Sequence, residues 1–420
     1  MIPAPIRAEA RYLMNTYRRP PVVFTHGKGC YLYDHRGRAY LDFLGGIAVN
    51  ALGHAHPRLV RVIRQQAARA IHVSNLFHNS FQGPLARKLA RWSGLDRVFF
   101  TNSGTEAIEG ALKLARLYAR QNTDGVPART RILALENSFH GRTFGALSIT
   151  GPAKYREPFA PLLPGVEFVR FNDVADLEAK FDSTVCAVVL ETIQGEGGIF
   201  PVSETFYRRA RQLCTERDVA LVADEIQCGL GRTGRYFAYQ KFAALPDIVA
   251  VAKPLAGGLP LGAILAKEKF AAAFSPGIHG TTFGGGPLVC AAALEFLTIV
   301  EEGNLLANVR ERGEELKSGL ARLAGKFDFV REIRGEGLML GMELSMEGAP
   351  YVQRAFRRGL LINCTHDRIL RFLPPFIIRA RHAKKFLAKL EIILATTPRP
   401  KLEAERVEAE VKALAMAAAR

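Results

Sequence analysis

Short apolar runs alternate with amphipathic stretches through the middle of the chain. The runs are RILALE, CAVVLE, ALVAD and DIVAVAK, and each ends at a polar residue. Strands that are covered on both faces of a sheet have such continuous apolar runs, and ligands gather where parallel strands end. Glu191, Asp224 and Lys253 each close one run, so we predict that they converge on one edge of one sheet.

The amphipathic stretches around these runs predict helices. Apolar residues recur at helical spacing in residues 57–71, 83–94 and 104–121. Residues 96–104 (DRVFFTNSG) are typical of a short strand that enters a glycine-containing loop. The alternation of strands and helices indicates the α/β fold class with a mostly parallel sheet.

The two ends of the chain have a different pattern. Residues 29–43 alternate around a turn at residues 34–37 and predict a hairpin. Beyond residue 295 the pattern predicts strands and helices of a second domain, after one long helix over residues 293–325. We expect four parts: an N-terminal segment (1–56) that packs with the small domain, a large domain (57–295), a small α+β domain (296–396) and a tail (397–420). For the tail, a terminal helix and a frayed or disordered segment remain equal alternatives.

Composition places the chain among cytoplasmic proteins. Its 420 residues are 48% hydrophobic, enough to bury the cores of more than one ordinary domain. There is no apolar run long enough for a membrane span, and the N-terminus lacks the features of a signal peptide. The six cysteines are dispersed without a CxxC pair, which indicates neither a zinc cage nor a disulfide framework.

The chain is strongly basic. Lys and Arg number 57 against 40 Asp and Glu, so the net charge is +17 and the pI is near 9.8. Such a balance attracts nucleic acid, an acidic protein or anionic metabolites. The basic residues are scattered, however, and no recognisable nucleic-acid motif accompanies them. We therefore expect a solvated basic surface, with an acidic protein partner as the alternative.

Several ordered motifs resemble class III aminotransferases of fold type I. They are NSGTEAIEGALKLAR, ENSFHGRTFGALSITG, ETIQGEGG, LVADEIQCGLGRTGRYFAY, DIVAVAKPLAGGLPLGAIL and HGTTFGGGPLVCAAAL. The resemblance runs from about residue 10 to 395. Within the family, YLMNTY, GIAVNALGHAHP, HVSNLFHN and GLLINCTHDRILRFLPP resemble the acetylornithine branch. The resemblance implies a pyridoxal-phosphate-dependent transferase with a mixed, mostly parallel sheet in a large domain and a smaller α+β domain.

The resemblance also implies a set of residues that bind pyridoxal 5′-phosphate. The set is Ser103, Gly104, Thr105, Phe139, Asp224, Gln227, Lys253 and Thr282. Lys253 would form the Schiff base and transfer the proton, Asp224 would face the pyridinium nitrogen, and Gln227 the phenolic oxygen. Ser103 to Thr105 open a helix, whose N-terminal amides attract phosphate. Phe139 would stack on the ring, and Thr282 would reach the phosphate in the neighbouring subunit, which makes the expected assembly a homodimer.

Substrate contacts are implied in the same way. Arg142 would bind a substrate carboxylate through a bidentate fork. Glu191 would pair with Arg371 and release it when a second carboxylate binds. The contacts expected for the distal acyl group are Asn50, Tyr17 and Asn79.

Two other motifs are set aside. GLGRTG (229–234) has the spacing G-x-G-x-x-G but lacks the acidic residue that a dinucleotide site has about 20 positions later. His54 and His56 have no third ligand nearby in the sequence, so we expect no metal. The departures from the family pattern are Ile108, Thr192 and Gly286, where the family has asparagine, proline and asparagine.

The resemblance implies an activity and leaves alternatives open. The leading expectation is a ping-pong transamination of N2-acetyl-L-ornithine with 2-oxoglutarate in arginine biosynthesis. A relative that acts on ornithine, succinylornithine or a carrier-bound lysine-pathway amine is the first alternative, and the net charge of +17 would suit an acidic carrier protein. A non-enzymatic binding protein with this fold is the alternative from another class.

Overall fold

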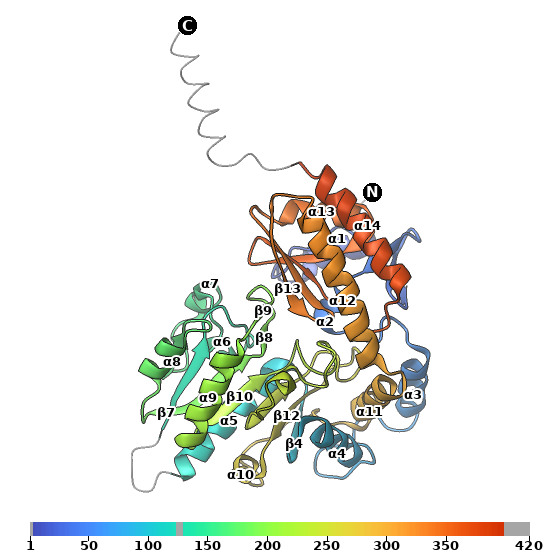
Figure 1. Ribbon diagram of the computed structural model, residues 1–420. Coiled ribbons are helices and arrows are strands. Elements are labelled where there is room, and N and C mark those ends of the chain that lie inside the picture. The colour runs from blue at the N-terminus through green and yellow to red at the C-terminus, as the bar shows by residue number, and fades with distance from the viewer. Residues whose placement is uncertain (1–2, 123–128, 399–420) are drawn as a thin grey trace, which may run out of the picture.

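The computed structural model describes residues 3–122 and 129–398. Its centre is a seven-stranded sheet with the order β4-β12-β11-β10-β7-β5-β6 (Figure 1). The strands are β4 (Arg97–Thr101), β5 (Arg131–Leu135), β6 (Val166–Val169), β7 (Val185–Glu191), β10 (Ala220–Asp224), β11 (Ile248–Val251) and β12 (Gly262–Ala266). β12 is antiparallel to both neighbours, and the other pairs are parallel. The expected α/β fold with a mixed, mostly parallel sheet is confirmed.

Helices cover both faces of this sheet. Along β7, Val189 packs in the cluster that contains the apolar face of α5 (Gly104–Gln121), while Leu190 packs in the cluster that contains α9 (Glu204–Glu216). Successive side chains of a strand point to opposite faces, so both faces of β7 are buried. This double burial is the reason that the strands are apolar throughout rather than alternating.

The described residues form further helices. They are α1 (Ala4–Tyr12), α2 (Gly45–Ala48), α3 (Pro57–Ala67), α4 (Gln82–Ser93), α6 (Phe144–Ser148), α7 (Ala153–Arg156), α8 (Val174–Lys180), α10 (Glu268–Ala271), α11 (Pro287–Glu302), α12 (Leu305–Ala324), α13 (Ala349–Arg357), α14 (Ala380–Thr396), and the short 3-10 helices η1 (Glu157–Phe159) and η2 (Ala238–Phe242). None of the helices in the described ranges is long and apolar enough to cross a membrane.

The C-terminal part of the chain builds a second sheet. It is four-stranded and antiparallel, in the order β13-β14-β17-β16. Its strands are β13 (Val330–Glu336), β14 (Met339–Leu344), β16 (Asn363–Thr365) and β17 (Ile369–Phe372). The short strands β8 (Ile193–Gln194) and β9 (Phe200–Pro201) form a separate hairpin.

The N-terminal strands lie beside this second domain (Figure 1). The strands are β1 (Phe24–Lys28), β2 (Tyr31–Asp34) and β3 (Ala39–Asp42), and β2 and β3 form the predicted hairpin. β15 (Leu360–Leu361) pairs in parallel with β3, so the two ends of the chain share one sheet.

The long helix expected over residues 293–325 is two helices. α11 ends at Glu302 and α12 begins at Leu305. Between them, Asn304 adopts a left-handed conformation with φ of 46°, which no α-helix can continue through. The domain boundary expected after residue 295 falls inside α11. The four-part division stays a prediction, and most of its tail (residues 399–420) lies outside the described residues.

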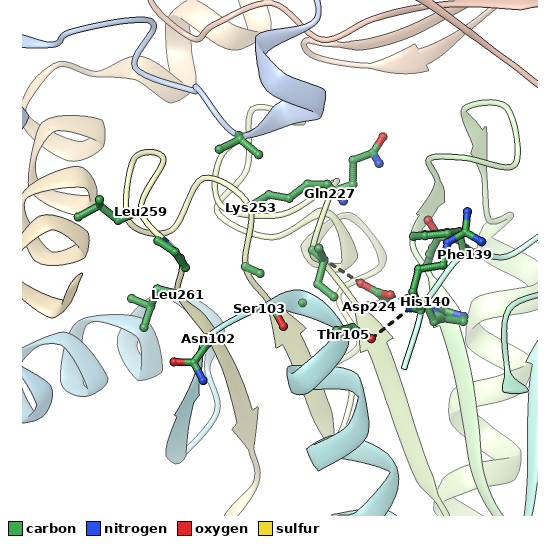
Figure 2. A pocket seen from close by; sticks show the side chains of 18 of the residues that line it. Asn102, Ser103, Thr105, Phe139, His140, Asp224, Gln227, Lys253, Leu259 and Leu261 are labelled. Carbon is green, nitrogen blue, oxygen red and sulfur yellow. Dashed lines mark hydrogen bonds and ion pairs between the residues drawn. The ribbon is translucent and has the colours of Figure 1, made fainter. Parts of the chain in front are cut away.

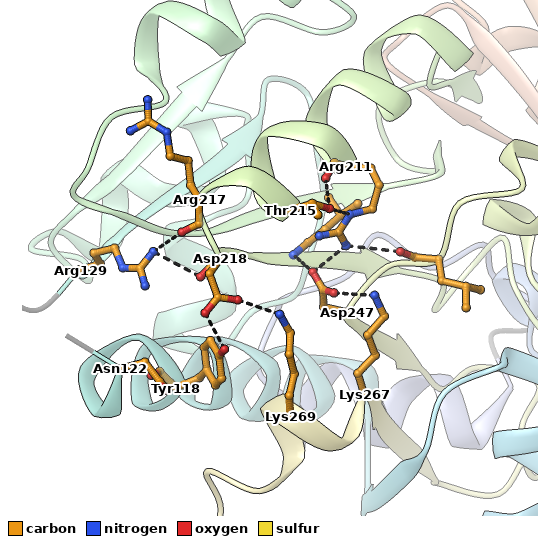
Figure 3. Close-up of polar contacts among 12 residues, drawn as sticks. Tyr118, Asn122, Arg129, Arg211, Thr215, Arg217, Asp218, Asp247, Lys267 and Lys269 are labelled. Carbon is orange, nitrogen blue, oxygen red and sulfur yellow. Dashed lines mark hydrogen bonds and ion pairs between the residues drawn. The ribbon is translucent and has the colours of Figure 1, made fainter. Parts of the chain in front are cut away.

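A polar network fastens the sheet at the end opposite to Lys253 (Figure 3). Asp247 precedes β11, and its buried carboxylate accepts hydrogen bonds from the Leu221 amide (2.9 Å), Arg211 (2.6 Å) and Lys267 (2.8 Å). These partners come from β10, α9 and the residue after β12, so one carboxylate ties together three neighbouring strands and a helix.

Candidate active site

The polar residues that close the central strands meet at one edge of the sheet. Glu191 and Asp224 are the last residues of the parallel neighbours β7 and β10, and they are paired in register. Lys253 follows the end of β11 by two residues. All three line one cavity of about 440 Å³. The predicted convergence is confirmed.

The other expected cofactor residues of this chain line the same cavity, with one exception. Those present are Ser103, Gly104, Thr105, Phe139, Gln227 and, from the substrate set, Arg142. Figure 2 shows Lys253 and Gln227 on one side, with Ser103 and Thr105 facing them at the start of α5. The exception is Thr282, which is exposed and does not line this cavity.

The surroundings of Lys253 disfavour the protonated form of its amine. Burial lowers its pKa from the ordinary value, although the nearby Asp224 and Glu196 carboxylates oppose that shift. Its backbone has a φ of 25°, an uncommon conformation for a residue with a side chain. A buried lysine with a lowered pKa carries a larger neutral fraction, which is the nucleophilic form.

Asp224 is held rigidly at the floor of the cavity. Its Oδ2 lies 2.7 Å from His140 Nδ1, and its Oδ1 accepts a hydrogen bond from the Ile226 amide at 3.0 Å. Both Asp224 and His140 are buried. A carboxylate fixed in this way can stabilise a protonated ring nitrogen. Sequence reasoning missed His140, although it stands next to Phe139 in the SFHGRT motif.

The start of α5 forms a backbone cradle. Ser103 is the N-cap, and its side chain accepts a hydrogen bond from the Glu106 amide at 3.3 Å. A Cβ on Gly104 would come within 2.9 Å of the Ile226 side chain, so any larger residue here would require that side chain to shift. The first amides of a helix have no partner within the helix, and the helix field favours an anion. The cradle therefore suits a phosphate.

Phe139 and Arg142 approach the cavity from one segment. The guanidinium of Arg142 lies 5.4 Å from the ring centre of Phe139 and 4.1 Å from that of Tyr155. Arg142 is exposed, and within the described ranges no carboxylate forms an ion pair with it. Its charge is thus available to an anionic ligand.

The ion pair expected between Glu191 and Arg371 is wrong. The buried Arg371 donates from Nη1 to Glu196 Oε1 at 2.6 Å and to Gln227 Oε1 at 3.1 Å. Both oxygens of Glu191 are occupied by the amides of Phe139 and Gly195. Glu191 still belongs to strand β7, whereas Glu196 lies in the loop that reaches Arg371.

The charge of Glu196 depends on this pairing. Burial opposes its ionisation, but the neighbouring Arg371 outweighs burial and lowers the pKa of the carboxyl. The glutamate of the QGEGG motif was therefore the correct candidate, and its place between glycines was the signal that sequence reasoning passed over.

The three expected acyl contacts have different surroundings. Asn50 lies near the cavity, because a Cβ on the lining residue Gly258 would be 3.5 Å from its Oδ1. Tyr17 is exposed, with the Arg19 guanidinium 5.3 Å from its ring centre. Asn79 donates to the Gly285 carbonyl at 3.0 Å, away from the cavity of this chain. Their substrate roles stay predictions.

The other motifs singled out in the sequence make structural contacts. In GLGRTG, the buried Arg232 donates to the Leu338 carbonyl at 3.2 Å and thereby ties this loop to the second domain. His54 bonds to Asp42 at 2.8 Å. Thr192, which replaces the proline of the family, donates to the buried Glu225 at 2.6 Å. Over residues 3–122 and 129–398 no cluster of three metal-binding side chains occurs.

The arrangement fits pyridoxal phosphate. The buried Lys253 amine suits its aldehyde, the oriented Asp224 carboxylate suits its ring nitrogen, and the α5 cradle suits its phosphate. These three groups, which differ in chemistry, line a single cavity of about 440 Å³, a size typical of small-molecule sites.

Known proteins are similar to this chain over most of its length. Residues 12–394 match the family described as Aminotransferase class-III. The acetylornithine aminotransferase of Aquifex aeolicus is 48% identical over 385 residues, which are 91% of this chain and 100% of that protein. The structure of the ornithine aminotransferase from Toxoplasma gondii ME49 has a TM-score of 0.89 and 34% identity, covering 93% of this chain and 94% of that one. The N-acetylornithine aminotransferase of Stenotrophomonas maltophilia K279a has a TM-score of 0.80 and 36% identity, covering 93% and 98%.

Proposed function

Because the chain belongs to the class III aminotransferase family, whose members use pyridoxal 5′-phosphate, we propose that it transaminates N2-acetyl-L-ornithine. The amino group passes to 2-oxoglutarate in a ping-pong reaction, giving N-acetyl-L-glutamate 5-semialdehyde and L-glutamate, a step of arginine biosynthesis. The observation that carries the proposal is the buried Lys253 amine, which shares one cavity with the Asp224 carboxylate. The dispersed cysteines support a cytoplasmic location.

The residues of the cavity divide the chemistry between them. When bound, the cofactor supplies an aldehyde for the amine and a ring that withdraws electrons. Lys253 would hold the cofactor through its aldehyde. Once the substrate amine has displaced it, the freed Lys253 amine would move a proton at the substrate carbon next to the nitrogen, a task that its lowered pKa assists. Asp224, oriented by His140, keeps a proton on the ring nitrogen.

Two arginines allow two different substrates to share the site. Arg142 binds the carboxylate at the far end of either substrate. Arg371 stays paired with Glu196 while the amine donor is bound, and pairs with the second carboxylate when 2-oxoglutarate arrives. In Glu196→Gln the arginine has no anionic partner, so we expect the KM for 2-oxoglutarate to fall. The donor half-reaction should slow by about tenfold, the size of one charged hydrogen bond. Unchanged constants for both substrates would contradict this role.

A homodimer is part of the proposal. Large apolar side chains are exposed on two adjacent segments: Ile71, Leu76, Phe77, Ile278 and Phe283. Hydrogen bonds from Asn75 to the carbonyls of Thr281 and Gly284 join these segments, so they form one surface. Exposed apolar clusters of this kind mark interfaces. Thr282 lies within this surface, where a second copy would receive it.

The dimer is tested by charge insertion. Phe77→Asp should shift the protein to a monomer in sedimentation velocity and weaken cofactor binding, because Thr282 would no longer reach the partner's site. Phe159→Asp is the matched control, since Phe159 is exposed but lies far along the chain from both segments. A Phe77→Asp protein that stays dimeric would overturn the assignment of this surface.

Ornithine and a carrier-bound amine are the competing substrates. The fold similarity to an ornithine aminotransferase favours the first, and the net charge of +17 favours the second. Half-reactions with acetylornithine, ornithine, succinylornithine and γ-aminobutyrate, followed by the visible absorbance of the bound cofactor, separate them. Steep loss of activity with added salt would favour the carrier.

Lys253→Ala tests the enzyme against a binding protein of the same fold. The variant should bind cofactor weakly and lose turnover. A wild-type protein that remains colourless with added pyridoxal phosphate would refute the enzymatic function altogether.

A further inference from the structure

Glu191 is a buried carboxylate of the cavity for which the proposed reaction has no use. It does not pair with Arg371, and each of its oxygens is already engaged. Oε1 accepts a hydrogen bond from the Phe139 amide and Oε2 one from the Gly195 amide, both at 2.9 Å. The carboxylate is therefore held by backbone amides at both of its oxygens.

The two amides belong to separate segments, and each segment delivers a residue to the site. The first carries Phe139 and Arg142 to the cavity. The second carries Glu196, the partner of Arg371. Glu191 itself is fixed at the end of β7, between β5 and β10 in the central sheet. The Glu191 carboxylate therefore sets the separation between Phe139 and Glu196, the partner of Arg371.

Close packing transmits this constraint to the cavity wall. A Cβ on Gly195 would lie 2.5 Å from the side-chain amide of Gln227, so the Gly195 backbone rests directly on that side chain. Gln227 in turn accepts a hydrogen bond from Arg371 at 3.1 Å. Displacement of the Gly195 amide would thus disturb both Gln227 and the arginine behind it.

We infer that Glu191 is a positioning residue that holds the Phe139 segment and the Glu196 segment in the geometry needed for transamination. The inference rests on the proposed function, because both segments matter only if the cavity holds the cofactor and its substrates. Glu191 acts through the two backbone amides and does not touch the reacting atoms.

The two hydrogen bonds that Glu191 accepts from the Phe139 and Gly195 amides should depend on pH. Burial raises the pKa of Glu191 to about 7, and the neighbouring Asp224 raises it further while His140 opposes the rise. The titratable groups that face it are Asp224 from β10, His140 next to Phe139 and Lys253 after β11. Below this pKa one oxygen carries a proton and meets an amide N–H as a second donor, so one of the two hydrogen bonds weakens.

Glu191→Gln tests whether Glu191 positions these two segments, and Glu225→Gln is its matched control. Glu225 is another fully buried carboxylate that follows directly after a central strand, and it accepts amides of Ala238 (2.7 Å) and Tyr239 (3.0 Å). Burial raises its pKa to about 7 as well, but it does not line the cavity. The two variants therefore remove equivalent charges, one inside the site and one outside.

The readouts are the visible circular dichroism of the bound cofactor between pH 6 and 8.5 and the rates of both half-reactions. Wild type and Glu225→Gln should show a transition in the dichroism near pH 7. Glu191→Gln should lack that transition, retain the visible absorbance and slow both half-reactions by about tenfold, as expected for misplaced groups. Identical profiles for the two variants, or a wild type without any transition, would overturn the inference.

A second substitution, Glu191→Asp, tests the inference if Glu191→Gln fails to fold. Glu191→Asp keeps the charge but shortens the reach, so it should retain the pH transition with slower half-reactions, and wild-type rates would overturn the inference. A wild type that gains no visible absorbance with pyridoxal phosphate would instead refute the proposed function. The two failures are therefore distinguishable.

Discussion

Substitution of Asp247 should destabilise the large domain without touching catalysis. Asp247→Asn removes a buried negative charge that binds Arg211 at 2.6 Å, Lys267 at 2.8 Å and the Leu221 amide at 2.9 Å. The variant leaves two cations without their anion, and the remaining amide oxygen cannot satisfy all three donors.

The expected size follows from the exposure of the partners. Breaking a fully buried ion pair costs about 3–5 kcal/mol. The side chains of Arg211 and Lys267 are 15% and 33% exposed and regain some water. We therefore expect a loss at the lower end, about 3 kcal/mol in the free energy of unfolding.

Asp218→Asn is the control from the same end of the sheet (Figure 3). Asp218 pairs with Lys269 at 2.7 Å, but their side chains are 46% and 52% exposed. Exposed pairs contribute at most about 1 kcal/mol, so this variant should unfold close to wild type. The contrast compares a buried carboxylate with an exposed one at the same end of the sheet.

Urea unfolding followed by tryptophan fluorescence measures both variants. Trp92 is the single tryptophan of the chain. It is buried, and its Nε1 donates to Glu301 at 2.6 Å. Half-reaction rates at 25 °C should remain at the wild-type value, because Asp247 lies at the opposite end of β11 from Lys253. Equal losses in the two variants, or a loss of rate in Asp247→Asn at full folding, would refute the reasoning.

Three further substitutions test neighbouring parts of the structure. Gly195→Ala would place a Cβ 2.5 Å from the Gln227 amide and should lower kcat at least tenfold, whereas Gly325→Ala, with no contact under 3.6 Å, should retain it. Burial raises the pKa of Glu225 from 4.5 to about 7, so its ionisation opposes folding as pH rises through that range. The free energy of unfolding of Glu225→Gln, relative to wild type, should therefore rise by about 3 kcal/mol from pH 4.5 to 8. Thr192→Val removes the 2.6 Å donor to Glu225 and should cost about 1–3 kcal/mol in urea unfolding; a neutral result would mean that this hydroxyl is dispensable.

Much of the site was accessible to sequence reasoning because it lies at strand ends. The continuous apolar runs of β7, β10 and β11 locate their own C-terminal ends, and parallel strands bring those ends together. Lys253 and Asp224 could therefore be placed side by side from local pattern alone. The start of α5 was equally readable, since Ser103 precedes a long amphipathic helix that begins where expected.

Contacts between distant segments were not accessible in this way. The choice between Glu191 and Glu196 as the partner of Arg371 depends on which carboxylate the loop after β7 carries toward the second domain. Both residues are glutamates of one motif, so composition and spacing cannot separate them. The break between α11 and α12 was also hidden in the sequence. The apolar residues keep their helical spacing through Asn304, but the backbone of Asn304 leaves the helical conformation.

The local pattern of apolar and polar residues thus specified the strands, their ends and the types of group that meet there. Which of those groups touch depends on loop paths and on the packing of two domains, which are set by long-range contacts that leave no periodic signal. His140 behind Asp224 and the Phe139 amide on Glu191 are contacts of this second kind. They arise only when segments separated by more than fifty residues are packed against the same sheet edge.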